Sequence, residues 1–219
     1  MSNNEDATAS VLCDLEVSAR YRSTYVNEPG DEHIVPHDFQ LITQDGIVVG
    51  RMLADLVCAS EIGAGGLHMV CDGDSSSLLN ICEALFDQET GDLREELNPN
   101  DDHVSRFLFI HRSVFLPCVS AATRQAMLHR IGSSVLNYDD LIVGWSSLCE
   151  LTASEMKELG YVRVAGTGMV FCHLTRRNPY SDFYEREGTV PVMEVVLPAT
   201  AAKDFEELWF ESCDEIPEY

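Results

Sequence analysis

Apolar and polar residues fall along the chain in blocks whose spacing predicts alternating strands and helices. The most strongly patterned block begins at Ser105 and runs to Leu116 in residues rich in Phe, Ile and Val, which is typical of a buried strand. Pro117 then interrupts regular pairing, and Ser120 is a favourable N-cap. Apolar residues after Ser120 recur at helical spacing as far as Gly132, where we expect the helix to end. The centre of the chain is therefore predicted to be a strand, a break and a helix.

The N-terminal third predicts a helix followed by a hairpin. Residues 11–28 place apolar side chains on one helical stripe, and Pro29 follows directly. Residues 39–43 and 47–59 have the composition of strands, and Asp45-Gly46 between them is a strong signal for a hairpin turn. We expect residues 1–10, which are polar and acidic, to be disordered.

The remaining pattern predicts further helices and strands in a mixed order. After the hairpin we expect a flexible connection at 61–66, a helix at 75–88 and an acidic loop at 91–102. After the central helix we expect a strand at 141–148 and a helix at 151–159, which a capping box of Thr152 and Glu155 opens. The last elements are two strands within 161–174 that are broken at 166–168, a strand at 190–197, and an acidic amphipathic helix at 201–213. This order predicts one α/β domain over residues 11–219, with a mixed sheet flanked by helices.

The net charge is −23, from 37 acidic and 14 basic residues. Such an excess of negative charge argues against nucleic acid as a partner, because phosphate backbones are bound by Lys and Arg. Three explanations of the acidity remain open: solubility, attraction to a basic protein, and imitation of the charge of DNA. No run of 18 apolar residues occurs, so we expect no membrane-spanning helix.

The eight cysteines are irregularly spaced and form no CxxC pair. Several lie within apolar runs, at Cys58, Cys82, Cys149 and Cys172, and are expected to be reduced core residues of a cytoplasmic protein. The N-terminus is unlike a signal peptide, which agrees with that location. A metal site is not expected, since the adjacent Cys172 and His173 would point to opposite faces of a strand.

Three short motifs resemble a known family. They are RYRSTYVNE at residues 20–28, GIVVGRML at 46–53 and HVSRF at 103–107. Together with the element order, they are similar to the GNAT acyltransferase superfamily, and more narrowly to its branch of autoinducer synthases and N-acyl amino acid synthases. A helix-bearing insertion at 63–102 is also typical of that branch. The resemblance implies a GNAT-like sheet that is splayed between the strands near 107–116 and 141–148.

The sequence departs from the family pattern at three places. The acyl-CoA loop of ordinary GNAT enzymes should lie near residues 121–127, where no glycine is present. His103 replaces the glutamate that opens the family's third motif, and a neutral imidazole can still accept a proton near pH 7. The acidic pair that the family carries before its hairpin has Asp31, Glu32 and Asp38 as candidates.

The resemblance implies transfer of an acyl group from a thioester to a small amino-acid-like amine. The donor would be acyl-CoA or the phosphopantetheine of an acyl carrier protein, without a metal. His103 would be the base, and Arg106 would hold the acceptor carboxylate. The remaining residues implied in binding are Arg20, Arg22, Arg51, Ser105 and Phe107 for the acceptor, and Leu116, Cys118, Ser120 and Arg124 for the acyl thioester.

Structural interpretations of the same residues stay open. His103 and Arg106 are as readily a surface histidine and an arginine paired at the surface, and Cys118 is more often a buried small hydrophobe than a nucleophile. A carrier protein is itself acidic, so its docking would need a basic patch, for which the candidates are Arg106, Arg112, Arg124 and Arg130. The rival function is a catalytically lapsed GNAT-fold protein that binds a ligand or a basic protein.

Overall fold

The computed structural model describes residues 11–21, 33–62, 65–98, 103–137, 139–174 and 193–214. Its strands are β1 Val11–Tyr21, β2 Ile34–Thr43, β3 Val48–Val57, β4 Arg106–Phe115, β5 Asp140–Trp145, β6 Val162–Arg163, β7 Met169–His173 and β8 Glu194–Leu197. Its helices are α1 Ala59–Ile62, α2 Gly66–Asp74, α3 Ser76–Leu85, α4 Ala121–Val135, α5 Ala153–Glu158 and α7 Ala201–Asp214, with 3-10 turns η2 Glu95–Leu97 and η3 Leu148–Glu150. Within these ranges, no helix is both long enough and apolar enough to cross a membrane.

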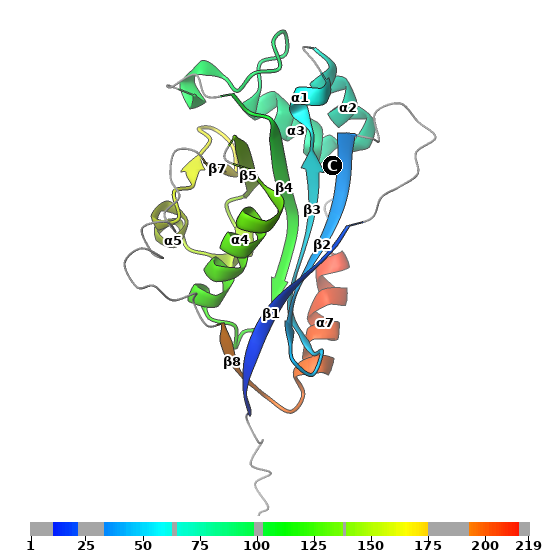
Figure 1. The fold of residues 1–219 in the computed structure, drawn as a ribbon, viewed down its shortest axis with the longest axis vertical. Helices are drawn as coiled ribbons and strands as arrows, with labels where there is room; N and C mark the ends of the chain where they lie inside the picture. Colours follow the sequence, from blue (N-terminus) through cyan, green and yellow to red (C-terminus); the bar gives the residue numbers. More distant parts are fainter. Residues whose placement is uncertain are drawn as a thin grey trace, which may run out of the picture.

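The strands form one mixed sheet in the order β6-β7-β5-β4-β3-β2-β1-β8. Neighbouring described strands are antiparallel except β4 and β5, which run parallel and are joined through α4. Helices cover both faces: α4 and α5 lie on one side of the sheet, and α2, α3 and α7 on the other (Figure 1). The predicted α/β class with a mixed sheet flanked by helices is therefore confirmed.

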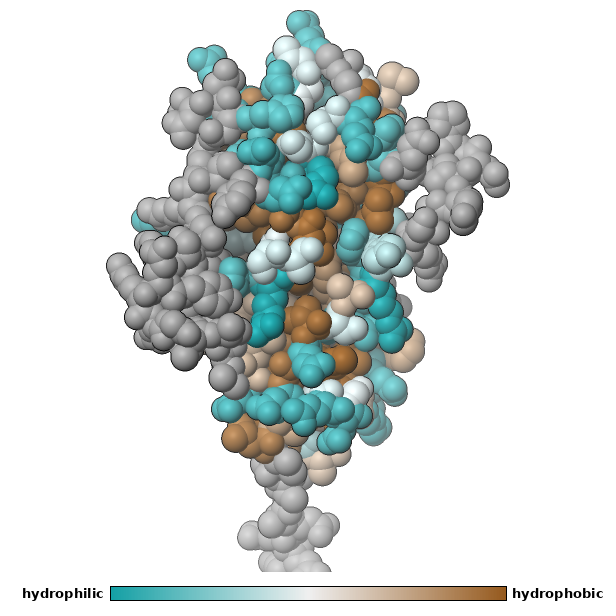
Figure 2. Space-filling view, in the orientation of Figure 1, coloured by the Kyte–Doolittle hydropathy of each residue, from teal (hydrophilic) through white to brown (hydrophobic). Residues whose placement is uncertain are grey.

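The two faces of the sheet follow from the alternation of side chains along β4. Leu108 and Ile110 pack in one apolar cluster with side chains of α4, whereas Phe107 and Phe109 pack in a second cluster with α2 and α3. Val57 of β3 belongs to the second cluster. Alternate residues of β3 between positions 51 and 57 therefore share the face on which α2 and α3 lie. The surface of the molecule shows separate apolar patches between hydrophilic side chains on the face seen in Figure 2.

Several local predictions are confirmed. The hairpin of β2 and β3 turns at Asp45-Gly46, where Gly46 has the positive φ of 81° that favours glycine. Ser120 caps α4 by accepting a hydrogen bond from the Thr123 amide, and Thr152 opens α5 with a capping box. The strand pair within 161–174, the last strand and the acidic C-terminal helix are also present.

The predicted helix at 11–28 is wrong over its described part, because residues 11–21 form strand β1. Its residues fit a two-residue period as well as a helical one: Leu15 is buried, while Leu12 and Glu16 on the other side of the strand are exposed. Pairing with β2 on one edge and β8 on the other decides between the two patterns. The expected disordered N-terminus at 1–10 lies outside the described residues.

Other boundaries differ because packing overrides local signals. Gly132 does not end α4, which continues to Val135, since Gly132 is buried against the side chain of Ile142 and lets helix and strand approach closely. Helix α2 was not expected, and it begins at Gly66 within the predicted flexible connection. The predicted strand at 141–148 ends at Trp145 and gives way to η3.

The strand assignment of β1 predicts unequal effects for two leucines. Leu15 is 7% exposed and Leu12 is 62% exposed. Leu15→Ala is expected to lower the free energy of unfolding by about 2 kcal/mol, because it removes buried methyl groups. Leu12→Ala should change it by less than about 0.5 kcal/mol. Urea unfolding of both variants tests the assignment, and equal losses would contradict it.

Candidate functional site

Strands β4 and β5 pair only at their first residues and then separate. Their parallel pairing ends at Ile110 and Gly144, β5 stops at Trp145, and β4 continues to Phe115. The register of β4 against β3 shifts at the same point, which leaves His111 as the extra residue of a β-bulge. We call this region, His111–Phe115 of β4 and Ser146–Leu151 after β5, the splay. Bulges of this kind re-aim side chains and often lie beside functional sites.

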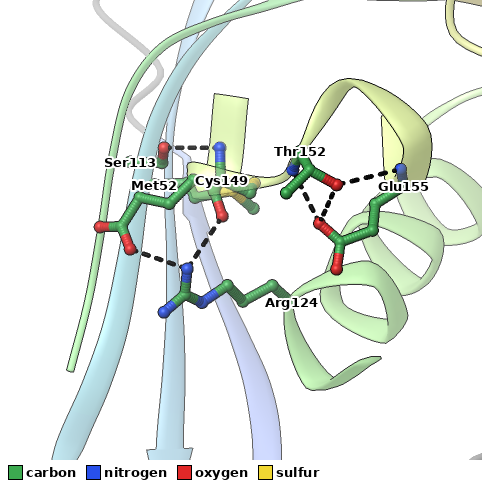
Figure 3. Close-up of polar contacts among 7 residues, drawn as sticks. Met52, Ser113, Arg124, Cys149, Thr152 and Glu155 are labelled. Atoms are coloured by element: carbon green, nitrogen blue, oxygen red, sulfur yellow. Dashed lines mark hydrogen bonds and ion pairs between the residues drawn. The ribbon is translucent and has the colours of Figure 1, made fainter. Parts of the chain in front are cut away.

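On the α4 side of the sheet, η3 fills the splay. The amide of Cys149 donates to Ser113 Oγ at 3.0 Å, so the segment after β5 is tied to β4 through a side chain (Figure 3). The thiol of Cys149 is fully buried and lies 3.2 Å from Met52 Sδ. Burial raises the pKa of the Cys149 thiol, which keeps it protonated and makes it a packing group.

Arg124 reaches from the first turns of α4 to the same segment (Figure 3). Its guanidinium lies 2.7 Å from a carboxylate oxygen of Glu150 and 3.4 Å from the Cys149 carbonyl oxygen, and 5.3 Å from the ring of Phe115. Cys149 and Glu150 both have φ of 53°, which is strained for residues other than glycine. The ion pair and the Ser113 hydrogen bond therefore hold a strained turn inside the splay.

On the opposite face, the bulge brings two titratable groups together. His111 Nε2 lies 3.6 Å from a carboxylate oxygen of Asp55, and their side chains are 37% and 18% exposed. Burial, followed by the charge of Asp74, raises the pKa of Asp55 to about 6. Burial and then the charge of Arg112 lower the pKa of His111. The pair combines a carboxyl group that titrates near neutrality with an imidazole that is neutral at pH 7.

Aromatic rings adjoin this pair. Phe109 lies with its ring centroid 5.8 Å from that of His111 and 6.4 Å from that of Trp145, the last residue of β5. Trp145 is only partly buried. The imidazole of His111 therefore lies where the pairing of β4 and β5 ends, beside the aromatic ring of Phe109.

Below the pair, α7 covers a row of charged residues. Arg51 donates two hydrogen bonds of 2.8 Å to the carboxylate of Asp38. The guanidinium carbons of Arg51 and Arg112 lie 4.2 and 4.6 Å from the ring centroid of Trp209. One terminal nitrogen of Arg112 is buried without a hydrogen-bond partner among the described residues. Arg112 therefore contributes a positive charge beside His111 that the Asp38 carboxylate, which is paired with Arg51, does not neutralise.

Four sequence-predicted site residues lie at the start of β4, away from the splay. His103 is exposed, and the backbone of Ser105 pairs with Asp139 and Ser60. Arg106 donates hydrogen bonds of 3.0 and 2.5 Å to a carboxylate oxygen of the fully buried Asp140. Phe107 is also fully buried and is part of the second apolar cluster.

The other predicted residues are spread over the molecule. Arg20 is exposed on β1, and Arg51 is paired with Asp38. Leu116 and Cys118 line a cleft of about 450 Å³ whose other wall is α7, with Asp204, Glu207 and Glu211. Cys118 is exposed there, which corrects the expectation of a buried cysteine. Ser120 caps α4 beside the splay, and Arg124 contacts the splay through Glu150. Arg22, Asp31 and Glu32 lie outside the described residues.

The candidate basic patch is divided by the fold. Arg106 is paired with Asp140 and Arg124 with Glu150, whereas Arg130 is exposed near the end of α4. Arg112 lies on the opposite face of the sheet, under Trp209. These four arginines therefore do not form one continuous surface.

Sequence reasoning missed the groups that meet at the splay, chiefly Asp55, His111, Ser113 and Glu150. The bulge that turns His111 toward Asp55 depends on the register of β4 against β3, which no local pattern reveals. A polar run of His, Arg and Ser inside an otherwise apolar strand is the only signal that the sequence offers.

No protein-family model, curated protein or solved structure matches the chain. Within the described ranges, no group of three or more His, Cys, Asp or Glu side chains could hold a metal ion. Among the cysteines whose side chains the structure describes, none forms a disulfide. Cys82, Cys149 and Cys172 are buried as expected, whereas Cys58 is only half-buried.

The raised pKa of Asp55 predicts how its replacement changes stability with pH. Because the folded-state pKa of about 6 exceeds the ordinary 3.8, Asp55 lowers stability as pH rises between those values. Asp55→Asn should therefore leave stability unchanged below pH 4 and raise it above pH 6, by at most about 3 kcal/mol at about 1.4 kcal/mol per pKa unit. Urea unfolding at both pH values, with the exposed Glu206→Gln as control, measures this. If Asp55→Asn raised the free energy of unfolding equally at both pH values, ionisation of Asp55 would not be the cause.

Proposed function

We propose that the chain is an N-acyltransferase that moves an acyl group from a thioester to a small amino-acid-like amine. The observation that carries the proposal is the splay: parallel neighbours β4 and β5 separate after Ile110 and Gly144, beside the capped start of α4. This is the place at which the resemblance to GNAT acyltransferases expects a splayed sheet. The parallel pair in a mixed sheet supports the GNAT-like interpretation of the fold.

Acyl transfer requires donors for the thioester oxyanion and an apolar slot for the chain. Helix α4 is 15 residues long, and its first amides lie at the end of β4, where a helix N-terminus favours developing negative charge. Leu116, Phe115 and Val119 are buried in the adjoining apolar cluster. The α4 side of the splay thus supplies hydrogen-bond donors for the oxyanion and an apolar surface for the acyl chain.

Donor binding at this place requires η3 to move. Glu150 is 52% exposed, so its ion pair with Arg124 is open to exchange with a negatively charged ligand. Release of the segment would also relieve the positive φ at Cys149 and Glu150. Arg124 would then be free to bind a phosphate of the donor.

The four arginines of the candidate basic patch do not form one surface, which favours coenzyme A over a carrier protein as donor. A carrier protein needs an extended basic surface on a chain of charge −23, and the four arginines do not supply one. Coenzyme A needs only a local cation. Carrier-protein docking would fall steeply with salt, because exposed charges are screened over about 10 Å at 0.1 M.

The test of the proposed function is product formation. Purified protein is incubated with octanoyl-CoA or octanoyl-carrier protein and a mixture of amino acids, at low and high salt, and analysed by mass spectrometry. An N-acyl amino acid that forms only with the protein supports the proposal. Absence of any N-acyl product, together with absence of thioester hydrolysis, would contradict it.

The second candidate is a binding protein that has lost the chemistry. The filled splay favours it, because Ser113 and Arg124 hold η3 where a donor would lie. The acidic wall of the cleft beside Cys118 suits a basic partner. Titration with oligolysine distinguishes this candidate: tight, salt-sensitive binding without thioester turnover would support it, and turnover without such binding would exclude it.

A further inference from the structure

The face of the sheet opposite η3 carries the partly exposed residues Leu53 and Asp55 and the exposed His111 between two groups of helices. Val57, near one end of β3, packs with α2 and α3, and Arg51, near the other end, lies under Trp209 of α7. Asp55 lies between them on the same face of β3. His111 contacts Asp55 from β4 and is the more exposed of the two.

We infer that His111 is the proton acceptor for the amine in the proposed acyl transfer, with Asp55 as the residue that positions its ring. This inference rests on the proposed function and replaces His103 in the role of base. His111 directly follows Ile110, the last β4 residue paired with β5, so it stands where the two strands separate, on the face opposite η3. The acceptor amine would therefore attack the thioester carbonyl through the gap between β4 and β5. His103 is eight positions earlier, about 26 Å away along an extended chain.

The contact between the two side chains fixes which nitrogen is available. Nε2 of His111 faces the Asp55 carboxylate at 3.6 Å, a separation within ion-pair range that is longer than a hydrogen bond. With the proton on Nε2, Nδ1 keeps its lone pair. Contacts of this kind commonly shorten when substrate closes the site. Burial and the charge of Arg112 lower the pKa of His111, which leaves the ring neutral near pH 7.

The step balances without another reactant. Nδ1 of His111 removes a proton from the amine nitrogen as that nitrogen attacks the thioester carbonyl carbon. The C–N bond forms, the C–S bond breaks, and the thiolate leaves and takes the proton from the imidazolium. Asp55 carries a negative charge above its pKa of about 6 and stabilises the imidazolium between these events. The charge of Asp74 contributes to the raised pKa of Asp55, and the charge of Arg112 opposes protonation of the His111 ring.

Arg112 also gives the site a preference for the acceptor. Its buried terminal nitrogen has no hydrogen-bond partner among the described residues, and it follows His111 directly in β4. A carboxylate on the acceptor would neutralise this cation while its amine lies near His111. An amino acid therefore fits better than a simple alkylamine.

Two histidine variants on the same segment test the inference. His111→Gln and His103→Gln are compared with the unmodified protein in octanoyl-CoA turnover with amino acid acceptors. We expect His111→Gln to lower kcat/KM about 100-fold or more, the usual contribution of a general base, and His103→Gln to change it less than about twofold. His111→Asn is a second variant, and urea unfolding shows that each protein is folded.

Asp55→Asn adds a readout that a purely structural role would not give. Loss of its carboxylate should lower the pKa of His111 and move the acidic limb of the pH profile of kcat/KM to lower pH, with a lower plateau. Full activity of folded His111→Gln and His111→Asn, or loss of activity in His103→Gln alone, would overturn the inference and leave acyl transfer intact. No product from the unmodified protein would overturn both.

Discussion

Replacing Arg106 by Met is expected to lower the free energy of unfolding by about 3–5 kcal/mol. Asp140 is fully buried, and one carboxylate oxygen accepts hydrogen bonds from Arg106 and from the amide of Asn137, the latter at 2.7 Å. Without the guanidinium, that buried negative charge loses its only ion-pair partner among the described residues. Urea unfolding at pH 7 measures the loss.

A double variant separates pairing from packing. Arg106→Met with Asp140→Leu removes both charges, and such replacements of buried ion pairs are often close to neutral. We expect it to recover most of the stability that Arg106→Met loses. Equal stability of Arg106→Met and the unmodified protein would contradict the structural role and return Arg106 to the candidates for substrate binding.

Phe107→Ala is expected to cost about 3–5 kcal/mol, as is usual for a large buried aromatic residue. The Phe107 ring is fully buried and lies 5.2 Å from that of Phe86 in the cluster beneath α2 and α3. Phe210 on α7 is 68% exposed, so Phe210→Ala is a matched control that should change stability by less than about 0.5 kcal/mol.

Thermal or urea unfolding of both variants measures the difference. A small loss from Phe107→Ala, combined with impaired ligand binding, would contradict the assignment of Phe107 to the core. The prediction from the family resemblance gave Phe107 to the acceptor site, so the two interpretations lead to opposite results.

The fold class was predictable because its strongest signals are local. The turn at Gly46, the cap at Ser120 and the capping box at Thr152 act within a few residues, and each is present. The strand β1 was not predictable in this way. Its residues satisfy both periods, and only the edges of β2 and β8 select the extended form.

The candidate site was less predictable than the fold. The family resemblance assigns Arg106 and Arg51 to the acceptor, but the buried Asp140 and the half-buried Asp38 pair with them. The pairing of Arg106 with Asp140 follows from the order of β4 and β5 in the sheet, and that of Arg51 with Asp38 follows from the register of the β2–β3 hairpin. The meeting of His111 with Asp55 likewise depends on a bulge, a feature of register between strands.

Hydrogen exchange with and without octanoyl-CoA shows whether the splay is the donor site. Bound donor should slow exchange of the backbone amides in residues 113–123, which adjoin the separation of β4 and β5. It should speed exchange in residues 146–151, because η3 must leave the splay and lose its hydrogen bond to Ser113. Coenzyme A without the acyl chain should protect the start of α4 more than the end of β4. Protection confined to 198–211, around the acidic cleft, or absent at every octanoyl-CoA concentration, would contradict the account.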